Sequence, residues 1–333
     1  MILRNHSGMA LVLALLAISF LVAITVQLSG TVNWQVKAST NLRDSVSIDA
    51  MNRSALNIAR ASLLADMNIN DYDSQHDDWQ ILPEKDLHLL LDSDNLTISV
   101  TDLSGKVQVN AFVSQEKDAG KRAQQEQAQY NLWLRLLTSG RFAIADEQEA
   151  IALLDSIIDW IDSNDDERDH GAEAGYYLSR EPPYEPRNAP VQNLEELLLI
   201  RGMTDDIFYG NDEYSGIRDY LTIYGTDGKI NINTAPAPVL QALADDLDET
   251  MVLRLVEFRQ DEGNREALAD PMWYKLVSGF PGDIELGTNL ITVKSYYFHI
   301  ASTVEKRDLA RTGSAVVYRD KSGAQNLLRW DIE

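Results

Sequence analysis

The sequence predicts an α+β protein in which a long N-terminal helix leads into a β-rich body that is interrupted by a large helical block. Three patterns support this prediction. An uncharged apolar run continues into an amphipathic stretch, alternating strand-like segments occur in two internal places and again at the C-terminus, and helical periodicity fills the sequence between them. This order of elements is expected when helices are inserted into an α+β body.

The N-terminal region has the hydropathy of a membrane span. Between Arg4 and Lys37 the chain contains no Lys, Arg, Asp or Glu, and about 18 of these residues form one apolar run. A helix rises about 1.5 Å per residue, so that run nearly crosses a hydrocarbon core of about 30 Å. We predict a transmembrane helix over residues 9–36, with Trp34 at the interface and Arg4 on the cytoplasmic side.

Three kinds of N-terminal segment share this hydropathy. A secretory signal peptide would be cleaved at a small-x-small site, but apolar sequence continues beyond the candidate at residues 17–19. A signal anchor fits equally well. The third is a prepilin leader, because a short hydrophilic segment that ends in Gly8 before an apolar helix resembles the leaders of type IV pilins and type II secretion pseudopilins. A prepilin peptidase would then cut between Gly8 and Met9. Those proteins usually carry Glu at the fifth mature position, where this chain has Leu13.

The overall composition indicates a folded protein with an acidic surface. Of the 333 residues, 44% are hydrophobic and 24% are charged, and the formal net charge is -23. Such a charge repels nucleic acid and anionic lipid headgroups, and it favours cations or basic partner surfaces. The chain has no cysteine, which excludes disulfides, thiolate nucleophiles and thiolate metal sites.

Residues 41–67 have the periodicity of an amphipathic stem that continues the first helix. The apolar face of this stem is formed by Met51, Ala55, Ile58, Ala59 and Leu63. We expect Asn52, Arg53 and Asn57 to point away from that face. Asn and Asp are frequent in residues 68–78, which predicts a loop after the stem.

Two segments alternate between apolar and polar residues around a glycine turn, and each predicts a β-hairpin. They cover residues 96–112 and 219–233. Both contain one six-residue pattern, which reads Gly-Lys-Val-Gln-Val-Asn at residues 105–110 and Gly-Lys-Ile-Asn-Ile-Asn at residues 228–233. Three further strands are predicted at residues 290–303, 315–320 and 326–332, separated by Gly313 and by residues 320–323.

Helical periodicity marks the sequence between and after these segments. One apolar stripe is formed by Tyr130, Trp133, Leu134 and Leu137, and another by Ile151, Leu154, Ile158 and Ile161. Residues that favour helix starts are Asn193, Pro236 or Pro238, and Asp248. These stripes and caps predict several helices that share a small core.

Five motifs follow one another along the chain. They are Asp159-Trp-Ile-Asp162, Gly171-Ala-Glu173 followed by Tyr176-Tyr177-Leu178, Pro182-Pro183-Tyr184, Leu194-Glu-Glu-Leu197 followed by Arg201-Gly202, and Ile230-Asn-Ile-Asn-Thr-Ala235. In this order, and behind a leader-like N-terminus, they resemble the general secretion pathway protein K family, the large minor pseudopilins of type II secretion systems. The resemblance covers essentially the whole chain.

This resemblance implies a pilin-like antiparallel sheet body that is interrupted by two SAM-like, helix-hairpin-helix-like units. The expected divisions are a prepilin leader (1–8), a transmembrane helix (9–36), a stem helix with the first part of the body (37–112), a first SAM-like unit (113–218), a second SAM-like unit (219–288) and the C-terminal strands of the body (289–333).

The resemblance also implies a non-enzymatic role at the tip of the pseudopilus. Such a protein is cut by prepilin peptidase, N-methylated, held in the bacterial inner membrane with its body in the periplasm, and assembled with other minor pseudopilins to initiate the pilus and support protein export. Family members commonly lack the fifth-position Glu, so Leu13 matches them. A tip subunit has no neighbour above it to pair with that carboxylate, and an unpaired carboxylate in hydrocarbon is costly.

The acidic loop, defined here as residues 162–173, has the ligand spacing of an EF-hand calcium loop. The residues at positions one, three, five, seven and twelve are Asp162, Asn164, Asp166, Arg168 through its carbonyl, and Glu173. Position six is Glu167, where the sharp turn of an EF-hand needs Gly. We therefore expect a calcium loop of another shape, and the family resemblance also implies calcium in the helical domain. The alternative is a solvated acidic loop.

Two other functions are weighed against this interpretation. Residues 231–236 are similar to helix-hairpin-helix modules that bind DNA backbones, but an acidic chain is poorly placed to neutralise phosphates. We therefore expect no nucleic-acid partner. A membrane-tethered hydrolase would need a nucleophile motif, and none is visible around the scattered His6, His76, His88, His170 and His299.

Overall fold

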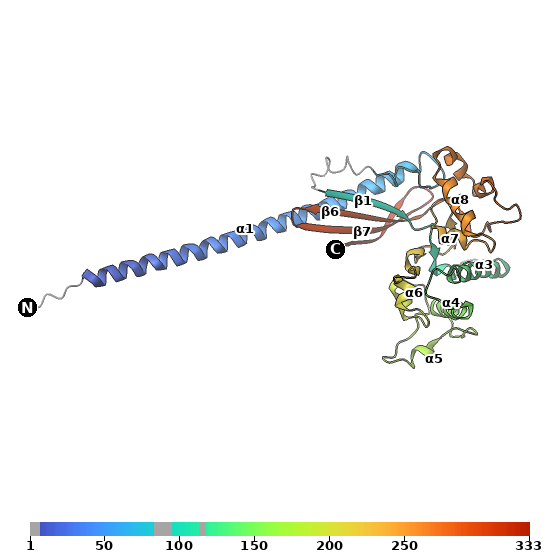
Figure 1. Cartoon of the computed structure of the whole chain (residues 1–333), viewed down its shortest axis with the longest axis horizontal. Coiled ribbons are helices and arrows are strands. Elements are labelled where there is room, and N and C mark those ends of the chain that lie inside the picture. The colour runs from blue at the N-terminus through green and yellow to red at the C-terminus, as the bar shows by residue number, and fades with distance from the viewer. Residues whose placement is uncertain (1–6, 83–94, 113–117) are drawn as a thin grey trace, which may run out of the picture.

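The computed structural model describes residues 7–82, 95–112 and 118–333, and its longest element is a helix that projects from the body (Figure 1). This helix, α1 (Ser7–Asp66), contains 60 residues. Among the described residues it is the one helix that is long and apolar enough to cross a membrane, and none of its most apolar window is buried. The predicted N-terminal apolar helix is thus confirmed, and it agrees with a single-pass anchor.

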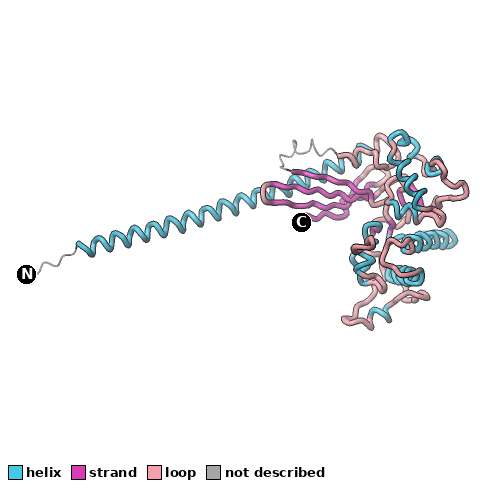
Figure 2. The backbone as a smooth tube through the Cα atoms, viewed as in Figure 1, coloured by secondary structure: helices cyan, strands magenta, loops and turns pink. Residues whose placement is uncertain are grey.

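The second half of α1 packs along a four-stranded antiparallel sheet (Figure 2). In spatial order the strands are β1 (Asn95–Asp102), β6 (Tyr297–Lys306), β7 (Leu309–Arg319) and β8 (Gln325–Ile332). Alternate residues of β6 face α1, and Phe298, Ile300 and Val304 join the apolar side chains of the stem in one core. Burying one large apolar side chain is worth about 1.5–3 kcal/mol, so this core holds the stem against the sheet.

The predicted apolar face of the stem is confirmed, but the prediction for Asn52 is wrong. Met51, Ala55, Ala59 and Leu63 are buried, and Ile58 is partly buried at the edge of the same core.

Asn52 is also completely buried, between α1 and the sheet. Its Nδ2 donates to the carbonyl of Arg311 at 3.3 Å, and its Oδ1 accepts a hydrogen bond from the Ser302 hydroxyl at 2.6 Å. These sheet partners replace water, so a polar side chain can lie in the interface without a large desolvation penalty.

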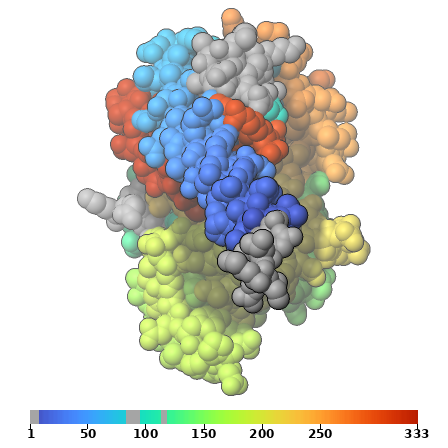
Figure 3. All heavy atoms as spheres, turned by 90° about the vertical axis from the view of Figure 1, so that its left-hand side faces the viewer, coloured from blue at the N-terminus to red at the C-terminus, as the bar shows by residue number. Residues whose placement is uncertain are grey.

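Between β1 and β6 the chain forms a helical insert beyond the end of the sheet (Figure 1). Its elements are β2 (Val107–Gln108), η1 (Val109–Phe112), α3 (Ala119–Leu137), α4 (Glu147–Ile161), α5 (Ala174–Tyr177), η2 (Leu194–Leu199), α6 (Asp205–Tyr209), η3 (Ile217–Tyr220), β3 (Leu221–Thr222), β4 (Ile230–Asn231), α7 (Ala237–Gln241), α8 (Glu249–Gln260), η4 (Glu262–Ala269), η5 (Trp273–Leu276) and β5 (Ile291–Thr292). Viewed from the N-terminal side, Figure 3 shows the yellow-green part of the insert as a separate lobe below the stem and sheet.

The helical stripes predicted from periodicity form the core of this insert. Trp133, Leu137, Leu154, Ile158 and Ile161 are buried together, and Tyr130, Leu134 and Ile151 are partly buried. Asp248 begins α8 as predicted, because its Oδ1 accepts a hydrogen bond from the Met251 amide at 2.7 Å.

Neither predicted hairpin forms. The first strand of each pair finds a distant partner: β1 pairs with β6, and β3 lies parallel to β2 with Leu221 opposite Val107. The second half of the later segment, β4, is parallel to β5. Alternation specifies which side chains of a strand are buried but not which strand lies beside it. The glycine turn in each segment therefore does not join two paired strands, as the hairpin prediction assumed.

The six-residue pattern shared by these segments has a structural role at its last residue. Asn110 is buried, and its Nδ2 donates to the carbonyls of Val191 and Ile223 at 3.0 and 2.8 Å. Asn233 is buried in the same way, and its Nδ2 donates to the Leu268 carbonyl at 3.0 Å. Asn110 therefore ties η1 to two loops of the insert, and Asn233, which follows β4, is tied to η4.

Two of the C-terminal strand boundaries also differ from the prediction. Gly313 lies inside β7, and the β6–β7 turn falls at residues 307–308 instead. A Cβ at Gly313 would lie 2.7 Å from the Trp330 ring and 3.2 Å from the Asn52 Cβ, so this glycine permits close packing of helix on sheet. Residues 293–296 separate β5 from β6, which divides the single strand predicted at residues 290–303.

Candidate functional site

The N-terminal residues with predicted roles lie along the projecting half of α1. Gly8 is inside the helix with open space around it, and Met9, Leu13 and Trp34 are exposed. Residues 1–6 of the predicted leader lie outside the described residues. An apolar surface of this kind, bare of protein contacts, is suited to contact lipid or other helices.

The acidic loop begins at the end of α4 and brings three carboxylates together. Asp162 ends α4, Glu173 precedes α5, and Asp159 lies one turn before Asp162 on α4. One oxygen from each of Asp159, Asp162 and Glu173 lies within 4.8 Å of the other two. The structure thus unites two of the five predicted ligands and adds Asp159. The i, i+3 spacing of Asp159 and Asp162 places both on one helical face, and this signal could have identified Asp159 from the sequence.

The other predicted ligands form turns within the loop. Asn164 Nδ2 donates to Asp162 Oδ1 at 2.8 Å, and Asn164 Oδ1 accepts from the Asp166 amide at 2.7 Å. The Arg168 carbonyl accepts from the Gly171 amide at 3.0 Å. Asn164 therefore contacts Asp162 through its amide nitrogen, which is not a metal ligand, and Asp166 is not among the three grouped carboxylates.

The three carboxylates are incompletely satisfied. Glu173 is only 4% exposed, and neither of its carboxylate oxygens accepts a hydrogen bond from the described part of the chain. Asp159 is completely buried, and its Oδ1 likewise lacks a hydrogen bond although Arg168 Nε lies 3.6 Å away. A buried charge without partners costs free energy, so this arrangement requires protons or a cation.

Burial and mutual repulsion change the acidity of the group. Burial is the larger cause, and with the charges of Asp159 and Asp162 it raises the pKa of Glu173 to about 7. Burial also raises the pKa of Asp159 to about 6, against the opposing effects of the Arg168 amide and guanidinium. Near neutral pH these two carboxylates therefore hold protons far more readily than exposed carboxylates do.

The donor set fits a calcium ion. Every offered ligand atom is a carboxylate oxygen, which hard cations such as Ca²⁺ prefer, and the chain has no thiolates to favour softer metals. The backbone is also shaped for the cluster, because a Cβ at Gly171 would collide with the Asp159 carboxylate.

The described histidines lie on separate elements and contact different groups. The His76 ring is 2.8 Å from the Arg259 carbonyl, the His299 ring is 2.9 Å from the Ser314 hydroxyl, and His170 is 3.6 Å from the Asp155 carboxylate. His6 and His88 lie outside the described residues. These contacts do not assemble the three into one catalytic group.

Comparison with known proteins identifies the family. Two family models, both described as type II secretion system protein K, match residues 105–213 and 230–279. The chain is 27% identical over 336 residues to type II secretion system protein K of Aeromonas hydrophila, covering 98% of this chain and 97% of that protein. It is 23% identical over 243 residues to the Pseudomonas aeruginosa protein of the same name, covering 72% of this chain and 66% of that protein.

A solved structure has a similar fold. It is the GspK-GspI-GspJ complex from the type 2 secretion system of enterotoxigenic Escherichia coli, with a TM-score of 0.61 and 15% sequence identity. The match covers 90% of this chain and 99% of the chain compared. At this identity the likeness establishes the fold alone, whereas the sequence match to the Aeromonas hydrophila protein covers 98% of this chain. The motifs, the fold and the matches agree: this chain belongs to the protein K family of type II secretion systems, whose members are structural minor pseudopilins.

Proposed function

We propose that this protein is a non-enzymatic minor pseudopilin at the tip of the type II secretion pseudopilus, where it initiates assembly and supports export of folded proteins across the outer membrane. The observation that carries this proposal is the division of α1 into two halves. The first half is apolar and exposed, while the second packs on the sheet and carries the insert at its far end. A rigid helix of this kind both anchors the body in a bilayer and packs beside similar helices.

The N-terminal segment has a defined fate in this proposal. Prepilin peptidase cuts after Gly8, Met9 becomes the N-methylated first residue, and residues 9–36 hold the protein in the inner membrane with its body in the periplasm. Leu13 leaves no carboxylate in the bilayer. This suits a subunit without a neighbour above it, because an unpaired carboxylate in hydrocarbon is costly.

The proposed partners are the other minor pseudopilins of the same system, in a hetero-oligomer. The structurally similar Escherichia coli protein was solved in the GspK-GspI-GspJ complex, which supports this choice of partners. The two separate family matches support the proposal that the insert contains two SAM-like units. We assign these units to packing, because a net charge of -23 opposes binding to nucleic acid.

The cofactor in this proposal is calcium, held in the acidic loop by Asp159, Asp162 and Glu173. The buried, unpartnered oxygens of Glu173 and Asp159 support this assignment. The ion would neutralise the cluster and fix the segment between α4 and α5, so its role is structural. No chemical step is assigned to it.

Processing and assembly test the proposal in one experiment. The full chain is expressed with its prepilin peptidase and its companion minor pseudopilins, and the affinity-purified product is examined by mass spectrometry. We expect a methylated N-terminus at Met9 and co-purification of the companions.

A matched pair of variants separates processing from a general effect on the helix. Gly8→Ala should leave the leader attached, whereas Gly30→Ala, at another exposed glycine of α1 with open space around it, should be processed normally. An intact N-terminus on the wild-type chain in the presence of active peptidase, or no companion in the purified product, would contradict the proposal.

A further inference from the structure

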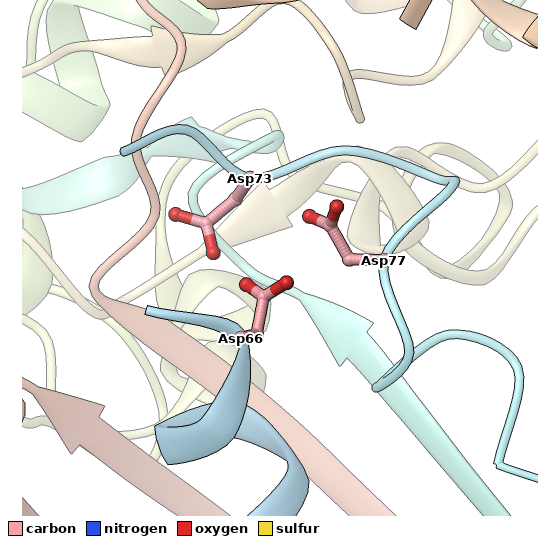
Figure 4. Close-up of side chains that lie close together, drawn as sticks. All are labelled: Asp66, Asp73 and Asp77. Carbon is pink, nitrogen blue, oxygen red and sulfur yellow. The ribbon is translucent and has the colours of Figure 1, made fainter. Parts of the chain in front are cut away.

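A second group of buried carboxylates lies where the end of the stem meets the sheet and the insert. Asp66 ends α1, and Asp73 and Asp77 follow in the next loop. Figure 4 shows the three carboxylates pointing toward one another, and each offers an oxygen within 4.8 Å of the others. We propose that this stem cluster of Asp66, Asp73 and Asp77 binds a divalent cation with a preference for oxygen ligands, best matched by calcium, at a site separate from the acidic loop.

Asp66 is the residue that most needs a cation. It is 2% exposed, and its Oδ2 accepts no hydrogen bond from any residue that the structure describes. Arg319 Nη1 lies 3.8 Å from that oxygen, which is too long for a hydrogen bond. An ionised carboxylate in this position is costly unless a positive charge contacts it directly.

The hydrogen bonds of the Arg319 guanidinium go to groups other than Asp66. Its Nη1 donates to the Leu63 carbonyl at 2.9 Å, and its Nη2 donates to the Asp73 carboxylate and to the Ser295 carbonyl. Its central carbon also lies 4.7 Å from the centre of the Phe298 ring. These contacts hold the guanidinium in place, and its only contact with Asp66 is the longer ion pair at 3.8 Å.

Asp73 and Asp77 are held in fixed directions by backbone amides. Asp73 Oδ2 accepts from the Ser295 amide at 2.7 Å, and Asp77 Oδ2 accepts from the Ser74 amide at 2.6 Å. Each carboxylate oxygen has two acceptor sites, so these bonds orient the groups and still leave lone pairs for a metal. Preorganised ligands of this kind lower the cost of binding an ion.

The charge of the stem cluster is not balanced by protein groups. Three carboxylates face the buried Arg319 and the Arg265 guanidinium, which is 3.5 Å from Asp77 and 39% exposed. Burial, followed by the charges of Asp77 and Asp73, raises the pKa of Asp66 to about 7. A divalent cation would supply the missing positive charge.

A cavity reaches two members of the stem cluster, Asp66 and Asp73. This cavity of about 300 Å³ is lined by Asp66, Asp73, Asn70 and Tyr72, among other residues. The Lys294 ammonium in its wall pairs with the exposed Asp71 carboxylate at 3.1 Å. Calcium takes six to eight oxygen ligands, and the cavity has room for the waters that would complete its shell around three carboxylates.

Metal binding tests this site in a protein whose acidic loop has been disabled. Full-length protein carrying Asp162→Asn and Glu173→Gln is purified in detergent, and bound calcium is measured by equilibrium dialysis. Terbium luminescence excited through tyrosine provides a second reading, because Tyr72 lines the cavity. We expect about one calcium per chain, and we expect Asp66→Asn in this background to weaken binding at least tenfold.

The matched control is Asp71→Asn, which removes the same charge from the rim of the same cavity and should leave binding unchanged. Equal binding by the two variants, or no binding of calcium or terbium by the background protein at millimolar concentrations, would overturn the proposal. If Asp66→Asn does not fold by circular dichroism, Asp77→Asn takes its place. Failure here would leave the pseudopilin assignment and the acidic loop unaffected, because both are tested separately.

Discussion

Replacing Glu173 by Gln should stabilise the protein without calcium and should remove most of the stabilisation that calcium provides. In chelator, the Glu173 carboxylate is almost completely buried and lacks hydrogen-bond partners in the described part of the chain. Its pKa is raised from 4.5 to about 7, mainly by burial, which corresponds to a cost of at most about 3 kcal/mol once the group is ionised. Gln has nearly the same shape without the charge, so the variant should be the more stable protein.

Calcium should cancel this difference in stability. An ion present at about 100 times its Kd stabilises a native protein by about 2.7 kcal/mol. Glu173→Gln replaces an ionised ligand with a neutral amide, so the variant should lose most of this gain. At about 2 °C per kcal/mol, its Tm should lie about 6 °C above that of the wild type in chelator. In calcium, the gain of about 2.7 kcal/mol by the wild type should bring the two Tm values to within about 1 °C of each other. Magnesium should have a smaller effect because it retains its own water shell.

The pH dependence in chelator tests the electrostatic origin of the effect. Because the folded pKa of Glu173 is above the unfolded value, the native state binds the proton more tightly. That stabilisation is fully present below pH 4.5 and is lost as the pH rises through about 7. The difference in stability between Glu173→Gln and the wild type should therefore be small near pH 4.5 and reach its maximum near pH 8.

Thermal melts of the full chain in detergent, followed by circular dichroism, would measure these differences. The control is Glu167→Gln, which removes an exposed charge from the same loop and should shift Tm little in either condition. If Glu173→Gln and Glu167→Gln gave the same shifts, or if calcium raised the Tm of Glu173→Gln as much as that of the wild type, the reasoning about the buried carboxylate would be refuted.

The remaining predictions concern packing and partners. Gly171→Ala should lower stability by about 1–3 kcal/mol in urea melts, because its Cβ would collide with the Asp159 carboxylate, whereas Gly175→Ala has open space and should cost little. Asn233→Ala should lower stability by about 3 kcal/mol. In the native protein the buried Trp273 Nε1 donates to Asn233 Oδ1 at 2.7 Å, and the substitution leaves this donor without an acceptor. A loss below about 0.5 kcal/mol would contradict this prediction. The protein should bind duplex DNA no more tightly than millimolar at physiological salt, and salt-dependent micromolar binding in an anisotropy assay would restore the nucleic-acid alternative.

The sequence by itself determined the features that depend on neighbouring residues. The uncharged run predicted the projecting half of α1, and the helical stripes predicted which side chains of α3 and α4 are buried. Asp248 marked the start of α8 because a cap satisfies amides within its own helix. Hydrophobic period and capping are local properties, so one chain segment contains the information for each of them.

Only the tertiary structure decided which distant groups meet. The alternating residues of β1 specified a half-buried strand but not that its partner would be β6, which follows the entire insert. Asn52 was assigned to the wrong face because its partners, Ser302 and Arg311, come from strands at the other end of the chain. A polar side chain can be buried wherever hydrogen bonds replace water, and the hydropathy of a sequence does not predict those bonds.

The two carboxylate clusters show the same contrast between what the sequence indicates and what only the structure reveals. In the acidic loop, ligand spacing selected Asp162 and Glu173, and helical geometry could also have selected Asp159. In the stem cluster, no spacing signal distinguishes Asp66, Asp73 and Asp77 from other acidic residues of a loop rich in Asp. Their significance comes from burial between α1, the sheet and the insert, and from the engagement of Arg319 with other groups. Burial changes the energy of a charge far more than sequence context does, and burial is a property of the folded chain.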